Sequence, residues 1–155
     1  MDIRDEKLVE LKEKAELEYK EIGSVFCPYF QEDVNFNAKG LEHIKFKGRN
    51  KARSHQDQYI RLRCLSLAPK IISLSHTLQG YQERNEMVNV KSGKWKYLMK
   101  SVNYFEFVAV LKEVRVRIIV RKVGSGEPDF WSIIPFWRMD KFGNRLIHSG
   151  NPSED

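Results

Sequence analysis

The stretch YFEFVAVLKEVRVRIIVRKV, residues 104–123, constrains the fold most strongly, because two consecutive runs in it alternate with a period of two. This period is typical of β-strands, whose successive side chains point to opposite faces of a sheet. Lys112 and Glu113 separate the two runs and predict a tight turn. If these two residues form the turn, the paired residues of the hairpin have numbers that sum to 225.

This register gives the predicted hairpin one wholly apolar face, on which four pairs meet: Phe105 with Val120, Phe107 with Ile118, Ala109 with Val116, and Leu111 with Val114. The other face carries Tyr104, Glu106, Arg115, Arg117 and Arg121. A slip of one residue would bury the arginines among phenylalanines, at a cost of several kcal/mol for each charge. We therefore predict that the apolar face packs on helices and that the arginines line a concave polar face.

A third strand is predicted in the run FWSIIPFWRM, which follows the loop GSGEPD. A six-residue loop at 124–129 would pair Val123 with Phe130, and therefore Arg121 with Ser132. The polar face would then hold a row across three strands that consists of Tyr104, Arg121 and Ser132. It would also hold Glu106 and Arg117, one pleat away from this row.

The rest of the chain predicts helices ahead of this sheet. Residues 5–21 carry few apolar side chains among Glu and Lys, which indicates a solvated helix, and residues 59–68 show helical spacing that Pro69 ends or kinks. Alternation at Val34 and Phe36 predicts short strands broken at 37–40. Residues 85–93 are interpreted as a loop or loose hairpin tip, and residues 95–99 as another strand.

The predicted fold class is α+β, with N-terminal helices packed on a roughly four-stranded antiparallel sheet. We divide the chain into a solvated helix at 1–22, one α+β domain at 23–148 and a flexible tail at 149–155. A formal net charge of +6 favours a polyanionic partner such as nucleic acid. Cys27 and Cys64 have no partners at metal-binding spacing, and no segment is apolar enough to cross a bilayer. We expect a cytoplasmic protein without a cofactor, a bound metal or a membrane.

The polar face offers the groups that metal-free RNA cleavage needs: a base for the 2′-hydroxyl, cations for the phosphate and a proton donor for the leaving oxygen. Glu106 is the candidate base, Arg117 and Arg121 would bind the phosphate, and Ser132 or Tyr104 would donate a hydrogen bond. The alternative is a surface salt-bridge ladder between Glu106 and its diagonal arginines. Both interpretations stay open on the sequence.

A second group of candidates lies in GLEHIKFKGRNKAR and the helix that follows it. His43 is a candidate acid or base, although a lone histidine at the end of a short strand is commonly structural. Six basic residues and one aromatic residue are candidates for nucleic-acid contact: Lys45, Lys47, Arg49, Arg53, Arg61, Arg115 and, by stacking, Tyr59. A solvated helix start explains the basic residues of this segment equally well.

The order of these features resembles the phage-associated nuclease domains grouped with barnase, EndoU, the colicin tRNases and RelE, the BECR fold. The resemblance covers roughly residues 26–137 and rests on CPYF, VNFNAKGLEHIKFKGR, RLRCL, YFEFVAVL, VRVRIIVRK and FWSIIPFW in that order. It implies helices before a four-stranded antiparallel sheet whose open face cleaves RNA without a metal. His43 would match the early histidine of that family, Arg121 the strand arginine and Ser132 the late hydroxyl.

Two functions are therefore carried forward. The first is a metal-independent endoribonuclease, a toxin or effector of a phage or mobile element, which cleaves RNA such as tRNA and has an acidic inhibitor or immunity protein. The second is a non-catalytic module of the same fold that binds nucleic acid or a protein.

Overall fold

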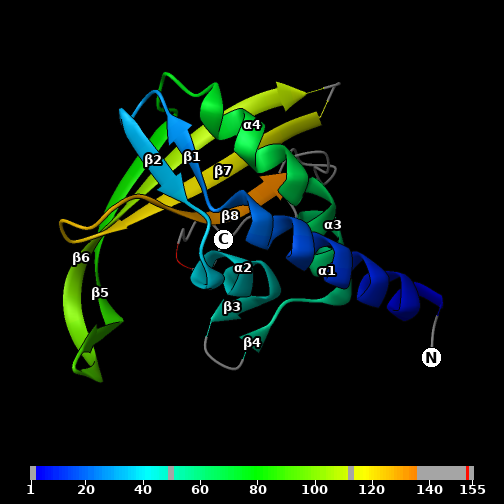
Figure 1. Cartoon of the computed structure of the whole chain (residues 1–155), viewed down its shortest axis with the longest axis horizontal. Helices are drawn as coiled ribbons and strands as arrows, with labels where there is room; N and C mark the ends of the chain where they lie inside the picture. Colours follow the sequence, from blue (N-terminus) through cyan, green and yellow to red (C-terminus); the bar gives the residue numbers. More distant parts are fainter. Residues whose placement is uncertain (1–2, 49–50, 112–113, 136–152, 154–155) are drawn as a thin grey trace, which may run out of the picture.

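The computed structural model describes residues 3–48, 51–111, 114–135 and 153 of the chain (Figure 1). The helices are α1 (Ile3–Ile22), α2 (Ala38–Lys45), α3 (His55–Cys64) and α4 (Ala68–Ser73), with a 3₁₀ turn at Leu65–Leu67 between the last two. The strands are β1 (Ser24–Cys27), β2 (Glu32–Asn35), β3 (Phe46–Gly48), β4 (Lys51–Ala52), β5 (Gly80–Ser92), β6 (Lys94–Leu111), β7 (Val114–Val123) and β8 (Asp129–Pro135).

The main sheet has six strands in the order β1-β2-β8-β7-β6-β5, and β3 pairs with β4 in a separate ribbon. Strands β5 to β8 pair antiparallel in sequence order. Three of them, β6 to β8, contain the predicted β-rich runs, whereas the strand predicted at 95–99 is the first part of β6 and β5 was not predicted. The sheet is larger than the predicted four strands, and it is mixed, because the β1–β2 hairpin joins β8 through a parallel contact between Asn35 and Asp129. The α+β class is confirmed.

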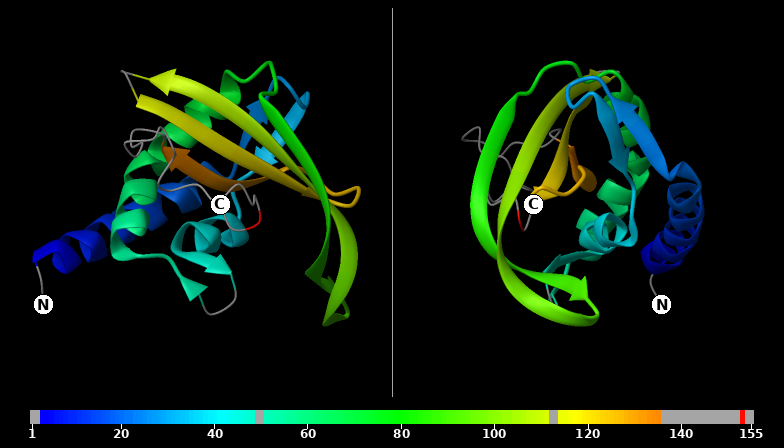
Figure 2. Two further views of the ribbon diagram at one scale, coloured as in Figure 1. Left: turned by 180° about the vertical axis from the view of Figure 1, so that it is seen from behind. Right: turned by 60° about the vertical axis from the view of Figure 1, so that its left-hand side comes forward.

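The predicted register of the β6–β7 hairpin is confirmed over ten pairs, from Val102 with Val123 to Leu111 with Val114. One face of this hairpin joins the main core beneath the helices, where Phe107, Val116, Ile118 and Val120 are buried. The other face carries a smaller apolar cluster that includes Tyr104 and Ile119 beside the arginines. The main core and this second cluster therefore lie on opposite faces of the hairpin, and Figure 2 shows α1 and α4 on one side of the sheet.

The predicted register between β7 and β8 is wrong. Ser132 pairs with Ile119, and Arg121 pairs with Asp129 rather than with Ser132. The register shifts between Ile119 and Val120, so that Trp131 is an extra residue with no partner on β7. Such a β-bulge keeps Phe130 in the main core while it turns the neighbouring side chain to the other face of the sheet.

Residues 37–40, predicted as a break between short strands, cap and begin helix α2 instead, and this helix continues through Leu41, which was predicted as strand. Asn37 caps this helix, because its side-chain oxygen accepts a hydrogen bond from the Gly40 backbone N–H at 3.2 Å. Gly40 also permits α2 to approach β8 closely, since a Cβ there would collide with the Phe130 carbonyl oxygen. Helix α2 thus lies against the bulged strand, where it carries Lys39 and His43 to the second face of the sheet.

The other departures concern length and position rather than type. Residues 85–93, predicted as a loop, belong mostly to the long strand β5, and the turn to β6 lies at Gly93, whose φ is 77°. The predicted helix at 59–68 ends earlier, since α3 stops at Cys64 before the 3₁₀ turn, and Pro69 is the second residue of α4. Tyr19 on α1 is buried against the core and donates a hydrogen bond to the Asn37 carbonyl at 2.6 Å. The predicted tail at 149–155 lies outside the described residues, apart from residue 153.

Candidate functional site

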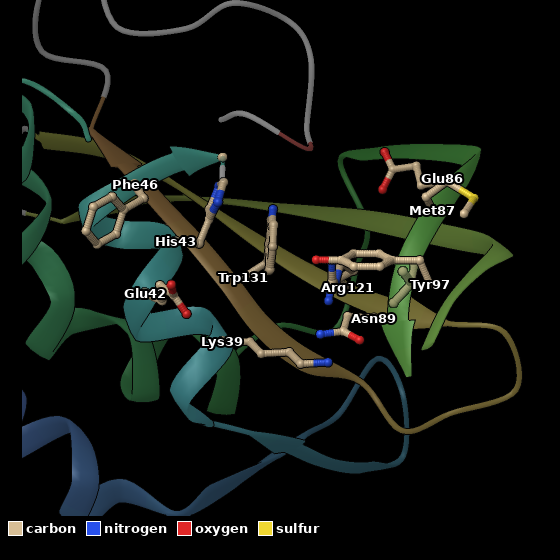
Figure 3. A pocket seen from close by; sticks show the side chains of 12 residues that line it. Lys39, Glu42, His43, Phe46, Glu86, Met87, Asn89, Tyr97, Arg121 and Trp131 are labelled. Atoms are coloured by element: carbon tan, nitrogen blue, oxygen red, sulfur yellow. The ribbon is translucent and has the colours of Figure 1, made fainter. Parts of the chain in front are cut away.

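A pocket of about 530 Å³ opens on the second face of the sheet, between α2 and the outer part of β5 and β6 (Figure 3). Helix α2 contributes Lys39, Glu42 and His43, and β3 contributes Phe46. The opposite wall is formed by Glu86, Met87, Val88 and Asn89 of β5 and by Tyr97 of β6, while Arg121 and Trp131 form the floor. The pocket therefore combines cationic, acidic and aromatic side chains from six separate elements.

Trp131 stands at the centre of the floor, between a histidine and an arginine. The His43 ring stacks on it with 4.0 Å between centroids and 17° between planes, and the Arg121 Cζ lies 3.9 Å from its centroid. Two groups this close to one ring centroid must lie on opposite faces of the ring, and Figure 3 shows Trp131 between them. Trp131 reaches this face because the residue before it, Phe130, is held in the main core opposite Val120.

His43 is held from behind by Arg53, which reaches it from the segment before α3. The Arg53 Nε donates to the His43 carbonyl oxygen at 2.9 Å, and its Nη2 lies 3.0 Å from the His43 Nε2. A guanidinium group has donors only, so the His43 Nε2 accepts and the neutral ring carries its proton on Nδ1. Arg53 therefore fixes the tautomer and the orientation of the His43 ring.

Ser132 is held in a similar way from α3. The Arg61 Nη1 donates to the Ser132 Oγ at 2.6 Å, and both side chains are fully buried. The Asp57 carboxylate accepts from the Arg61 Nε at 2.7 Å and pairs with the Arg53 Nη1 at 3.5 Å. Asp57 therefore links Arg53, which contacts His43, to Arg61, which contacts Ser132. Through these contacts, α3 helps to fix the positions of α2 and β8.

Glu106 and Arg117 do not line the pocket. They form an ion pair with each other across β6 and β7, in which their side chains are 22% and 13% exposed. This is the salt-bridge arrangement that stood as the alternative to a catalytic base.

Tyr104 lies beneath the pocket wall rather than in it. It is buried and pairs with Arg121 in the predicted register, and its hydroxyl donates to the Glu86 Oε2 at 2.7 Å. Burial raises the pKa of Tyr104, and the hydrogen bond to Glu86 raises it further. Tyr104 therefore keeps its proton and holds Glu86 in the pocket wall.

The basic candidates do not form one track along the surface. Arg53 and Arg61 are buried in the network described above, and Arg49 lies outside the described residues. Lys45 pairs with Glu16 at 2.8 Å, and Lys47 is exposed on β3. Arg115 is exposed on β7, outside the pocket, and Tyr59 is half-buried with the Arg63 guanidinium 5.8 Å above its ring.

Of the predicted catalytic residues, the pocket brings together His43 and Arg121.

Sequence reasoning missed Lys39, Glu42, Glu86 and Tyr97 as pocket residues. Lys39 and Glu42 were missed because α2 was read as strand, although Asn37 followed by a run with Leu41 and Ile44 is a helix-start pattern. The β5 residues were missed because their segment was read as a loop.

The described residues contain no group of three or more His, Cys, Asp or Glu side chains placed to hold a metal ion. Within the same part of the chain, none of the helices has the length and apolar character that a membrane span requires. Comparisons with protein-family models, with curated proteins and with solved structures gave no match.

Proposed function

We propose that this chain is a metal-independent endoribonuclease that binds and cleaves RNA in the pocket over Trp131. The observation that carries the proposal is the meeting of Arg121 and Lys39 with Glu42 and Glu86 in one pocket of about 530 Å³. This volume is within the range of small-ligand sites, which suits a nucleotide unit of a strand. The net charge of +6 supports an anionic substrate.

Arg121 is assigned to the phosphate. Its guanidinium is stacked on Trp131, and among the described residues its buried Nε has no hydrogen-bond acceptor. A phosphate oxygen supplies the missing acceptor, and a planar guanidinium binds such oxygens in pairs. Lys39 adds a second cation from α2, and Figure 3 shows its side chain directed into the space between α2 and β5.

The reaction assigned to the pocket is internal transesterification. A carboxylate, Glu42 or Glu86, takes the 2′-hydroxyl proton, and the 2′-oxygen attacks phosphorus. Arg121 and Lys39 stabilise the charge that develops on the phosphate oxygens. The bond to the 5′-oxygen breaks, this oxygen takes a proton from water while the carboxylic acid returns its proton to solvent, and the products are a 2′,3′-cyclic phosphate and a 5′-hydroxyl.

The test is incubation of the purified protein with total RNA or tRNA in excess EDTA, followed by analysis of the new ends. Cyclic phosphate ends are expected from the wild type, with a large loss in Arg121→Gln and Lys39→Ala. Lys14→Ala is the matched control, since it removes one positive charge from an exposed position on α1. Separate Glu42→Gln and Glu86→Gln variants identify the base as the one that abolishes product while RNA affinity is kept. A folded protein that cleaves no RNA refutes the proposal.

A non-catalytic nucleic-acid-binding module is the second candidate. It is favoured by the engagement of the His43 Nε2 by Arg53 and of the Ser132 Oγ by Arg61, which gives two predicted catalytic groups a structural partner. This candidate predicts salt-sensitive RNA binding that depends on Arg121 and Lys39, with no product ends. The resemblance to the BECR nucleases favours the first candidate, and with it a phage or mobile-element origin and an acidic inhibitor that competes with RNA for the basic face.

A further inference from the structure

Strands β5 and β6 continue well beyond the rest of the sheet as a two-stranded ribbon. The last pair between β6 and β7 is Val102 with Val123, whereas β5 and β6 stay paired from there to Ser92 and Lys94. Residues 85–101 therefore form a ribbon, which projects away from the body of the protein in Figures 1 and 2. An isolated two-stranded ribbon is only marginally stable in water, so this ribbon needs stabilising contacts with the pocket wall or with a ligand.

The outer part of this ribbon exposes large apolar side chains. Met87, Trp95, Tyr97, Leu98 and Met99 are between 41% and 62% exposed. Exposed apolar groups gathered on one projecting element are typical of a binding surface.

The charge of the ribbon indicates the class of partner. Residues 91–100 contain Lys91, Lys94, Lys96 and Lys100 and no acidic residue. The Lys91 Nζ lies 5.9 Å from the centroid of the Trp95 ring, so a cation and an aromatic face are presented together. Protein–protein interfaces are depleted in lysine, whereas surfaces that bind single strands combine lysines for the backbone with aromatic rings for the bases.

The ribbon is continuous with the pocket, because Glu86, Asn89 and Tyr97 belong to both. Tyr97 and Trp95 are two residues apart on β6, which corresponds to about 7 Å along a strand. A nucleic-acid strand with one nucleotide over Trp131 would therefore pass Tyr97 and then Trp95 as it leaves the pocket.

We infer that the ribbon at 85–101 is a binding arm for single-stranded RNA that flanks the nucleotide in the pocket. Trp95 stacks on a base, and Lys91, which pairs with Trp95 across the ribbon and shares its face, contacts the backbone phosphate. This inference rests on the proposed function for the path of the strand, while the arm itself needs no catalysis.

The experiment measures binding of uncleavable 2′-O-methyl oligonucleotides, two and eight nucleotides long, by fluorescence anisotropy over a series of salt concentrations. The wild type is expected to bind the octanucleotide more tightly than the dinucleotide. Trp95→Ala should weaken octanucleotide binding by about 5- to 150-fold, and Trp95→Phe should restore part of the loss. The Lys91→Gln variant should lower the salt slope by about 0.7, and dinucleotide binding should stay unchanged in all three.

Two matched controls are available. Phe26→Ala removes an aromatic ring of similar exposure from β1, and Lys14→Gln removes the same charge from α1. Circular dichroism and the melting temperature establish that each variant is folded. If Trp95→Ala and the lysine variant bind the octanucleotide like the wild type, or if the α1 variant weakens it equally, the arm is not an RNA site.

The failures of the two proposals are distinguishable. If pocket variants leave dinucleotide binding and cleavage intact while ribbon variants weaken octanucleotide binding, the arm stands and the pocket assignment fails. If ribbon variants lose affinity for a purified partner protein but keep full affinity for RNA, the ribbon is a protein interface and the inference is overturned.

Discussion

Replacement of Gly40 by alanine tests the close contact between α2 and β8 on which the pocket depends. A Cβ at Gly40 would collide with the Phe130 carbonyl oxygen and would lie 2.7 Å from the Tyr19 hydroxyl. The carbonyl belongs to a paired strand and cannot swing aside, so α2 must shift. Overpacking of this kind costs about 1–3 kcal/mol, and the better helix propensity of alanine returns at most about 1 kcal/mol.

The expected net loss is about 1–2 kcal/mol of unfolding free energy, which for a chain of this size lowers Tm by about 2–8 °C. Thermal unfolding followed by circular dichroism measures it. Gly48→Ala is the matched control, because nothing lies within 4 Å of a Cβ at Gly48 and its φ is not positive. A Gly40→Ala protein that melts at or above the wild-type temperature would show that α2 does not press on β8. The shift of α2 should also weaken RNA binding, since α2 carries Lys39 and His43.

Three further predictions follow from buried or paired groups. Ser132→Ala removes the hydroxyl that accepts a hydrogen bond from the buried Arg61 Nη1, so urea denaturation should show a free energy of unfolding lower by about 1.5–3 kcal/mol. An unchanged urea midpoint would show that Arg61 does not stabilise β8. Burial raises the pKa of Asp129, although a hydrogen bond from Asn35 opposes this shift. The protonated carboxyl group therefore adds to the free energy of unfolding below the ordinary Asp pKa. This contribution is lost as the pH rises through the raised pKa of the folded protein. Asp129→Asn should therefore be more stable than the wild type at neutral pH and flatten its pH profile of Tm, and the opposite order would contradict the burial argument. Glu106→Gln removes the carboxylate of a largely buried ion pair outside the pocket, so it should cost about 1–3 kcal/mol and leave RNA affinity and cleavage unchanged, whereas a catalytic Glu106 would abolish product.

The β6–β7 hairpin was predictable because a single physical term decides its register. Every alternative of opposite parity buries arginines such as Arg117 against phenylalanines such as Phe107, and no local preference compensates for that cost. The α+β class followed from the same hairpin, together with the helical spacing before Pro69. These features depend on patterns that extend over many residues, which is why the sequence alone was sufficient.

The pocket was not predictable in the same way, because it depends on single residues that interrupt the patterns. The bulge at Trp131 adds one residue to β8, and a count of loop length cannot detect it. Helix α2 has only eight residues and follows Val34 and Phe36, whose alternation suggests that the strand continues. The missed elements are thus short or irregular, and their geometry is set by tertiary contacts such as that between Gly40 and Phe130.

The arginines at odd positions of β7 illustrate how one pattern can serve different purposes. Arg117 meets Glu106 in an ion pair, whereas Arg121 meets the ring of Trp131. The difference comes from their neighbours on β8, because Arg117 pairs with Ile134 whereas Arg121 lies beside Trp131. Phe130 is held in the main core opposite Val120, so the next residue, Trp131, points to the second face. If this register continued without the extra residue, Ser132 would pair with Ile118 of the main core instead of Ile119. The chemistry proposed for the chain therefore depends on Phe130 staying in the core, since this is what sets Trp131 between His43 and Arg121.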